Sequence, residues 1–222
     1  VLLSAGNFME RREWYTPSAN GDGKIYNCLY RNEASEQKAI IVIVHGMQSH
    51  SGRYLSWTKE LTGLGFTVAM LDLQGHGKSQ NHPGSFGPTN GWEYLLHDIR
   101  RLILKVKKWF PELPVILFGH SMGSFAVRSY VVKFPSDADA LILSGTGGFN
   151  YSFYSALGIL AADLKLHDHM TPGIKYGKFI TYLFNKDIVN PVNAGAWCCT
   201  DEEICKQHAS DPLSVYFTTG SY

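Results

Sequence analysis

The sequence lacks the features that mark several common functional classes. It has 20 basic and 19 acidic side chains, a net charge of +1 and no long basic run. We therefore expect no nucleic-acid partner, because nucleic-acid-binding proteins gather Lys and Arg into patches. No apolar run approaches the roughly 18 residues of a membrane span, so no transmembrane segment is expected. Internal repeats and low-complexity segments are absent as well.

Cysteine is also scarce, with Cys28, Cys198, Cys199 and Cys205 as the four in the chain. Three of them are crowded together, and no second cluster completes the spacing of a zinc site. We expect no metal and no cofactor. Free thiols in a reducing compartment are favoured, and a disulfide is the alternative. The first residues are too short and lack the basic leader of a signal peptide, so we expect a cytoplasmic protein.

Apolar runs alternate with amphipathic segments along the first two thirds of the chain. Residues 39–44 are apolar without alternation, the pattern of a strand that is buried on both faces, and the predominantly apolar runs 66–71, 115–118 and 140–143 predict three more buried strands. Between the second and third run, residues 91–110 keep apolar side chains at helical spacing on one face. Buried strands that alternate with helices predict a mostly parallel α/β sheet in one domain.

An antiparallel hairpin is expected ahead of these runs. Two extended segments, at about 13–16 and 24–30, flank Asn20-Gly-Asp-Gly23. Asn-Gly and Asp-Gly readily adopt the positive φ of tight turns, so this hairpin is predicted at an edge of the sheet.

A serine between two glycines follows the third apolar run. Residues 115–118 lead directly into Gly119-His-Ser-Met-Gly123, and a helical pattern comes next. A strand, a sharp turn with serine and a helix form the nucleophile-elbow arrangement. A Cβ at Gly119 or Gly123 would collide with the strand or the helix. Ser121 would then project at a helix N-terminus, which favours a developing negative charge. An ordinary strand-to-helix turn is the alternative.

The alternation stops after the fourth apolar run. We expect the core over residues 1–146, a cap insertion over 147–196 and a return to the core over 197–222. The cap segment is rich in aromatic residues, which predicts an apolar cover near the serine, although these rings could simply pack the cap onto the body. Thr200-Asp-Glu-Glu203 has the form of a capping box and predicts Thr200 as the N-cap of a helix to about His208.

Three ordered motifs resemble the α/β-hydrolase fold. His45-Gly46 follows the first buried strand, Asp72-x-x-Gly-His-Gly-x-Ser79 follows the next, and the elbow at 119–123 follows the third. The run His-Gly-x-x-x-His-Ser-Gly-Arg-Tyr over 45–54 is similar to the monoacylglycerol lipase and lysophospholipase branch. Phe184-Asn-Lys186 and the run from Trp197 to Leu213 look like bacterial members of that branch.

This resemblance implies a serine hydrolase that cleaves carboxylic esters, monoacylglycerol or lysophospholipid above all, through an acyl-enzyme on Ser121. A serine hydroxyl needs a base and a stabilised oxyanion to react. The oxyanion donors in this fold map to the backbone N–H groups of Met47 and Met122. His45 would orient the loop and would not act as the base. The other supporting residues are Gly46, Gly119, His120 and Gly123.

The acid and base of the triad do not appear in the sequence. In this fold they follow the serine on loops after two further strands, and nothing after Leu143 has that pattern. We therefore expect that the sequence stops before the last strands and before the triad Asp and His. A partner chain that supplies them is one alternative, and His167 or His169 is another. The remaining candidates are Asp163, Asp168, Asp187, Asp201, His208 and Asp211.

Three further consequences stay open at this point. A sheet without its last strands would expose an apolar edge that invites self-association. An aminopeptidase or a small-ester esterase could use the same fold, with Asp163 or Asp168 recognising a free amine. A non-catalytic protein of the same fold, which binds through its cap, is the rival from another class.

Overall fold

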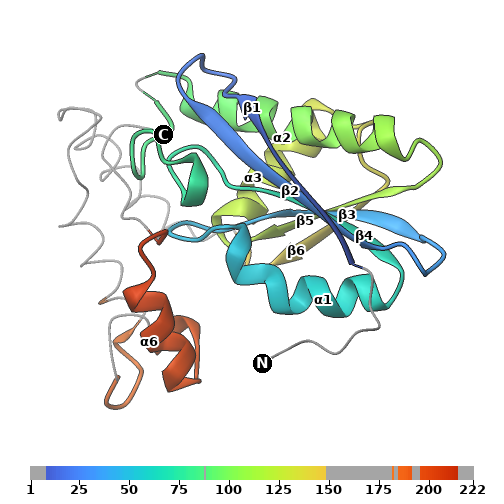
Figure 1. Ribbon diagram of the computed structural model, residues 1–222. Helices are drawn as coiled ribbons and strands as arrows, with labels where there is room; N and C mark the ends of the chain where they lie inside the picture. The colour runs from blue at the N-terminus through green and yellow to red at the C-terminus, as the bar shows by residue number, and fades with distance from the viewer. Residues whose placement is uncertain (1–8, 88, 149–181, 183–184, 192–195, 215–222) are drawn as a thin grey trace.

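The computed structural model describes residues 9–87, 89–148, 182, 185–191 and 196–214. Within them, six strands form one sheet in the order β1-β2-β4-β3-β5-β6 (Figure 1). Their bounds are β1 Met9–Pro17, β2 Lys24–Asn32, β3 Ala39–Val44, β4 Phe66–Leu71, β5 Val115–His120 and β6 Ala140–Ser144. β1 and β2 form the expected antiparallel hairpin, and β2 is antiparallel to β4. The four remaining strands are parallel, so the predicted mostly parallel sheet is confirmed.

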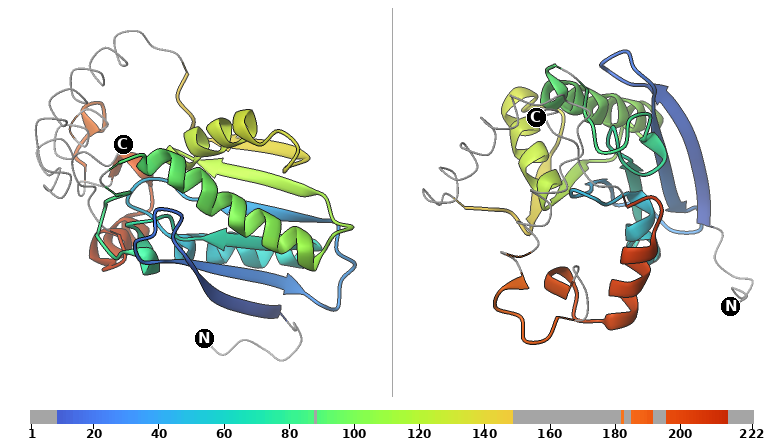
Figure 2. Two further views of the ribbon diagram at one scale, coloured as in Figure 1. Left: turned by 90° about the horizontal axis from the view of Figure 1, so that it is seen from above. Right: turned by 90° about the vertical axis from the view of Figure 1, so that its left-hand side faces the viewer.

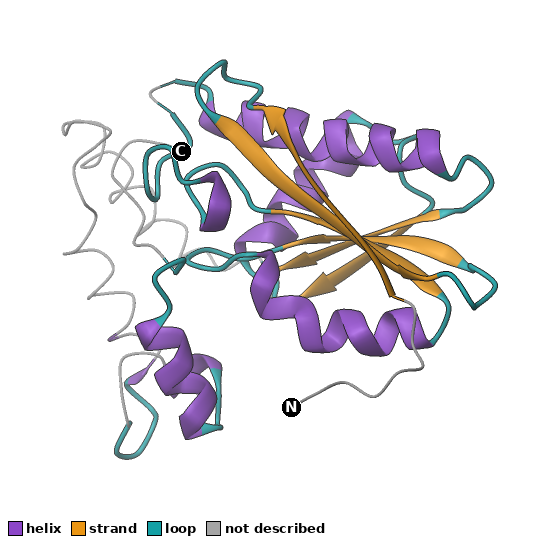
Figure 3. Cartoon of the chain, viewed as in Figure 1, coloured by secondary structure: helices purple, strands orange, loops and turns teal. Residues whose placement is uncertain are grey.

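Helices cover both faces of this sheet (Figures 1 and 3). One face carries α1 (Leu55–Gly63), and the other carries α2 (Gly91–Trp109) and α3 (Met122–Lys133). A fourth helix, α6 (Glu202–Ser210), lies beyond the end of the sheet. Short 3₁₀ helices occur at η1 (Ser51–Tyr54), η2 (Gly77–Ser79) and η3 (Ala196–Cys198). The α/β-hydrolase arrangement expected from the motifs is therefore present in the described residues.

The hydrophobic core has two unequal parts. The larger lies between the sheet and α2 with α3, because α2 presents an apolar stripe to the sheet and its charged residues other than the buried Asp98 lie outside that stripe. The smaller lies on the face that α1 covers and contains residues such as Ile41, Met70 and Phe118. β3 is buried along its whole length, since it lies between β4 and β5 and has core on both faces.

β6 differs from the prediction of a fourth buried strand. It is a strand, but Leu141, Ile142 and Leu143 are 38%, 46% and 38% exposed. β6 pairs with β5 alone among the described strands, and α1 does not extend over it. Figure 2 shows β6 at the open edge of the sheet. An apolar run therefore predicted the strand correctly and its burial wrongly, because burial depends on neighbours that the run itself does not specify.

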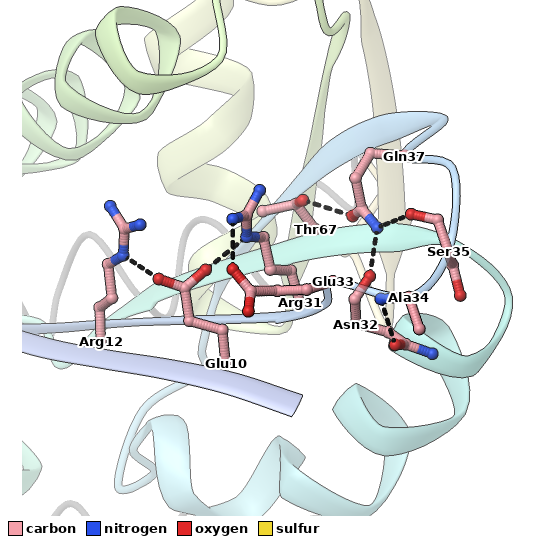
Figure 4. Close-up of polar contacts among 9 residues, drawn as sticks. All are labelled: Glu10, Arg12, Arg31, Asn32, Glu33, Ala34, Ser35, Gln37 and Thr67. Carbon is pink, nitrogen blue, oxygen red and sulfur yellow. Dashed lines mark hydrogen bonds and ion pairs between the residues drawn. The ribbon is translucent and has the colours of Figure 1, made fainter. Parts of the chain in front are cut away.

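Polar contacts hold the far end of the hairpin and the connection into β3 (Figure 4). The carboxylate of Glu10 lies between Arg12 and Arg31 and forms an ion pair with each. The Gln37 side chain accepts a hydrogen bond from the Thr67 hydroxyl at 2.7 Å and donates to the backbone oxygens of Asn32 and Ser35. These contacts fix the edge hairpin and the start of β3 at the end of the sheet opposite the elbow.

The predicted cap falls largely outside the described residues, so the division at 147 and 196 stays a prediction. The helix expected after it is present as α6, with one correction. Asp201, not Thr200, is the N-cap, and its carboxylate accepts hydrogen bonds from the amides of Glu203 and Ile204. The negative charge of Asp201 at the N-cap also interacts favourably with the positive end of the helix dipole, an interaction that a neutral Thr does not supply. Every described helix is too short or too polar to span a lipid bilayer.

Candidate active site

Ser121 occupies a sharp turn between β5 and α3. Its backbone has φ 52° and ψ −121°, a positive-φ conformation that residues other than glycine rarely adopt. The Ser121 amide donates to the Ser144 carbonyl at 2.9 Å, which ties the turn to the end of β6. The Ser121 carbonyl accepts from both the amide and the hydroxyl of Ser124, at 2.8 and 2.5 Å. These bonds hold the strained turn, which places Ser121 at the N-terminus of α3.

The glycines on either side of Ser121 are required by close packing. A Cβ on Gly123 would lie 2.2 Å from the Val44 carbonyl oxygen, and one on Gly119 would lie 2.5 Å from the Gly123 carbonyl oxygen. Neither backbone group can move aside cheaply. A Cβ on Gly46 would lie 3.0 Å from the Cβ of Ser121, so the loop after β3 closely approaches the serine. The steric argument made from the sequence therefore agrees with the structure.

His45 fixes the start of the loop after β3. Its Nε2 accepts from the Leu73 amide at 2.9 Å, so its Nδ1 carries the proton and donates to the Gly46 carbonyl at 2.7 Å. Burial lowers the pKa of His45 to about 4, and the hydrogen bond to the Gly46 carbonyl opposes this shift only in part. Both ring nitrogens of this neutral histidine are occupied, so His45 has no lone pair left to deprotonate a serine.

Asp72 holds the same region from the next loop. Its two carboxylate oxygens accept from the amides of Ser51 and Lys78, at 2.7 and 2.8 Å. Gly77 must be a glycine here, because it has φ 52° and a Cβ would lie 2.3 Å from the Asp72 carboxylate. The motif Asp-x-x-Gly-His-Gly-x-Ser thus joins the loop after β4 to the loop after β3. The sequence showed the motif, but the Asp72 contact with Ser51 was not expected.

The two predicted oxyanion donors lie on the segments that meet at Ser121. Met122 is the first residue of α3, whose first amides have no acceptor within the helix. Met47 follows Gly46, where a Cβ would lie 3.0 Å from the Cβ of Ser121. The helix N-terminus adds a partial positive charge at this point. The arrangement suits an oxyanion, and the assignment of the Met47 and Met122 amides to that role stays a prediction.

Tyr54 is a site residue that sequence reasoning missed. Its hydroxyl lies 3.2 Å from Nδ1 of His120, the residue just before Ser121, and the two rings meet edge to face. Burial raises the pKa of Tyr54 to about 12, and burial together with the nearby Arg53 lowers the pKa of His120. A neutral tyrosine and a neutral histidine therefore lie beside the serine. The only signal in the sequence was the closing Arg-Tyr of the motif over 45–54.

No described side chain forms a hydrogen bond with the hydroxyl of Ser121. His76 is fully buried, and its Nδ1 lies 3.0 Å from the Gln74 carbonyl. His50 and Asp211 superficially resemble a base with its acid, since Nε2 of His50 lies 2.7 Å from the Asp211 carboxylate. The other nitrogen of His50, however, accepts from the Gly52 amide at 3.1 Å. His50 therefore cannot accept the serine proton.

The remaining acid and base candidates are distributed as follows. Asp187 is largely exposed beside Lys186, and Asp201 serves as the N-cap of α6. His208 lies in the last turn of α6. The other four, Asp163, His167, Asp168 and His169, lie outside the described residues. In the described part of the chain no three His, Cys, Asp or Glu residues are grouped as metal ligands would be.

Comparisons with known proteins agree with this geometry. A family model described as serine aminopeptidase, S33 (Hydrolase_4) matches residues 35–220. Monoglyceride lipase of Homo sapiens is 36% identical over 183 residues, and that of Rattus norvegicus is 31% identical over the same length. Each match covers 81% of this chain and 59% of the relative. The chain thus spans about three fifths of the length of these relatives.

A solved structure extends the likeness to the fold. A highly thermostable carboxyl esterase from Bacillus coagulans, determined in complex with glycerol, is 28% identical to this chain and superposes with a TM-score of 0.83. The match covers 94% of this chain and 67% of the esterase. The fold of this chain is therefore similar to that of a solved carboxyl esterase.

Proposed function

Because the chain belongs to the serine aminopeptidase S33 family, we propose that the protein is a serine hydrolase that cleaves carboxylic esters through an acyl-enzyme on Ser121. The observation that carries this proposal is the strained backbone of Ser121, held at the N-terminus of α3 against the Gly46 loop. Strain of this kind persists only where the surroundings enforce it, and it is common at catalytic residues. The Ser121 hydroxyl would attack the ester carbon as the triad base takes its proton, and the Met47 and Met122 amides would stabilise the oxyanion. The C–O bond to the alcohol would then break, the alcohol would leave with that proton, and water would hydrolyse the acyl-enzyme to release the acid.

The proposed substrate is monoacylglycerol or lysophospholipid. The likeness to monoglyceride lipases at 31–36% identity supports a small glycerol ester. We place the triad acid and histidine outside the described residues, since both ring nitrogens of His45 and of His50 are engaged and no described side chain forms a hydrogen bond with the Ser121 hydroxyl. No cofactor enters this chemistry, because a base and two backbone donors suffice for acyl transfer.

The first test is the mass of the intact protein after exposure to a fluorophosphonate. If a base in this chain or in a partner chain activates Ser121, the wild-type chain takes up a single adduct that Ser121→Ala loses, because only an activated serine reacts at a useful rate. Gly148→Ala is a matched control, since a Cβ at Gly148 would have no atom of the described residues within 4 Å. Wild-type protein that takes up no adduct would contradict an activated Ser121 in this chain, and would fit either a triad acid and base that this chain does not carry or the non-catalytic alternative.

A substrate panel separates the ester hydrolase from its rival within the family. The family description favours an aminopeptidase as the second candidate. We expect hydrolysis of monoacylglycerol or lysophospholipid, measured as released fatty acid, to exceed hydrolysis of aminoacyl amides with a free amine. The reverse preference would assign the peptidase.

We further propose that the protein self-associates through the outer edge of β6 and resides in the cytoplasm. The exposed Leu141, Ile142 and Leu143 support the first proposal, because an unpaired apolar edge strand is a template for pairing. Sedimentation of Ile142→Lys should show less association than wild type, and an unchanged profile would contradict this. The buried Cys28 thiol, which forms no disulfide, supports a reducing compartment, and cell fractionation tests it.

A further inference from the structure

A hydrogen bond joins the loop after β3 to the segment after α6. Nε2 of His50 lies 2.7 Å from Oδ2 of Asp211, although the two residues are 161 positions apart. Both side chains are sheltered, with 8% of His50 and 26% of Asp211 exposed. Figures 1 and 2 show the end of α6 beside the loop that leaves β3. This contact therefore bridges the sheet and the return segment.

The direction of the bond follows from the partners of each group. The Gly52 amide donates to Nδ1 of His50 at 3.1 Å, so Nδ1 is an acceptor and Nε2 carries the proton. Nε2 then donates to Asp211, whose other oxygen accepts from the Leu213 amide at 2.9 Å. Burial opposes the charge of Asp211, but the bonds from His50 and Leu213 outweigh it and lower the pKa of this carboxyl. The pair is thus a neutral donor and an ionised acceptor, each with its hydrogen-bond geometry satisfied.

The loop that His50 belongs to needs such support. Gln48 has φ 57°, a left-handed conformation outside its usual range. It lies between Met47 and His50, so strain is stored next to the predicted oxyanion donor. His45 holds one end of the loop through Leu73, and Asp72 holds the other through the Ser51 amide. Both of these anchors belong to loops of the sheet, whereas the Asp211 anchor comes from beyond α6.

We propose that His50 and Asp211 are a positioning pair. Through their hydrogen bond, the geometry of the Met47 amide depends on how the segment after α6 packs against the loop after β3. This inference rests on the proposed function, because it gives the loop the task of holding an oxyanion donor. In this arrangement His50 does not touch the substrate. His50 lies three residues after Met47 in the same strained loop, so a shift of Asp211 would move His50 and with it the loop.

Hydrogen exchange of the full chain tests the coupling without any need for activity. His50→Asn keeps an oxygen near the place of Nδ1, so the Gly52 amide stays capped while the bond to Asp211 is lost. Asp211→Ala removes the bond from the other side. In both variants we expect the amides of residues 46–52 to exchange about ten- to a hundredfold faster, as suits loss of a hydrogen bond to a charged group. The double variant should be no faster than either single one, because the two residues act as a unit.

Asp201→Ala is the matched control. It removes the N-cap of α6 and leaves both His50 and Asp211 in place. Under the proposal it loosens the start of α6 and leaves residues 46–52 close to wild type, and α2 stays protected in all variants. Unchanged exchange of residues 46–52 in Asp211→Ala would overturn the proposal. So would additive effects in the double variant.

Kinetics of an active enzyme form give the second readout. Where wild type hydrolyses esters, both single variants should lower kcat about tenfold or more with little change in KM, because an oxyanion donor acts mainly in the transition state. A rise in KM at constant kcat would contradict a role in donor positioning. If wild type hydrolyses no ester while the exchange results hold, the proposed function fails and the structural coupling stands.

Discussion

β3 and β6 are two strands of similar apolar sequence with opposite surroundings. Ala39–Val44 is buried at every position, whereas the side chains of Leu141, Ile142 and Leu143 are each more than a third exposed. β3 lies between two strands and has core on both faces, and β6 pairs on one side only among the described strands. The site is built on the buried strand, since the loop after β3 closely approaches Ser121. The comparison teaches that a strand becomes a rigid platform through its neighbours rather than through its own residues.

The largest expected effect comes from filling space beside β3. In Gly123→Ala the new Cβ would lie 2.2 Å from the Val44 carbonyl oxygen, so the elbow must distort. We expect the free energy of unfolding to fall by about 4 kcal/mol or more, as for other severe core changes. Gly148→Ala, after β6, adds a Cβ with no atom of the described residues within 4 Å and should change the free energy of unfolding by less than about 0.5 kcal/mol. Urea denaturation followed by circular dichroism measures both, and similar losses would break the comparison.

A smaller effect is expected from the same substitution on each strand. Ile40→Ala on β3 removes a side chain that is 0% exposed, which should cost about 3 kcal/mol of unfolding free energy. Ile142→Ala on β6 removes one that is 46% exposed and should cost about 1 kcal/mol or less. Urea midpoints at equal protein concentration give the two values. Equal costs would mean that β6 is buried in solution, for example by another copy of the chain.

The smallest expected effect is the response of the buried histidines to acid. Burial lowers the pKa of His45 to about 4 and that of His76 to about 3. The unfolded chain, with histidine near its ordinary pKa of about 6.5, binds more protons below that pH, so stability falls as the pH falls. Burial raises the pKa of Asp98 to about 6, which acts in the opposite direction. From pH 7.5 to 6.0 we expect a net loss of about 1 kcal/mol in unfolding free energy.

One variant sharpens that measurement. Asp98→Asn removes the opposing group and should steepen the loss of unfolding free energy between pH 7.5 and 6.0. The reading is again the urea midpoint at each pH. Stability that stays constant or rises between pH 7.5 and 6.0 would contradict neutral, buried histidines beside β3 and β4.

The sequence by itself determined the local structure and the elbow. Uninterrupted apolar runs predicted the parallel strands, and an Asn-Gly-Asp-Gly turn predicted the hairpin, because these signals act over a few neighbouring residues. Glycines at 119 and 123 predicted close approach of the backbone, and the Cβ contacts agree. Each of these features depends on what one short segment can adopt, so a single segment suffices to show it.

Only the tertiary structure decided which of these segments meet. β6 is exposed because, among the described strands, only β5 pairs with it. The N-cap of α6 is Asp201 and not the predicted Thr200, because the path of the chain into the helix places Asp201 at the first turn. The contacts of Tyr54 with His120 and of His50 with Asp211 join residues 66 and 161 positions apart. Pairs so distant leave no periodic signal in the sequence, because only the packed sheet brings their side chains within hydrogen-bond distance.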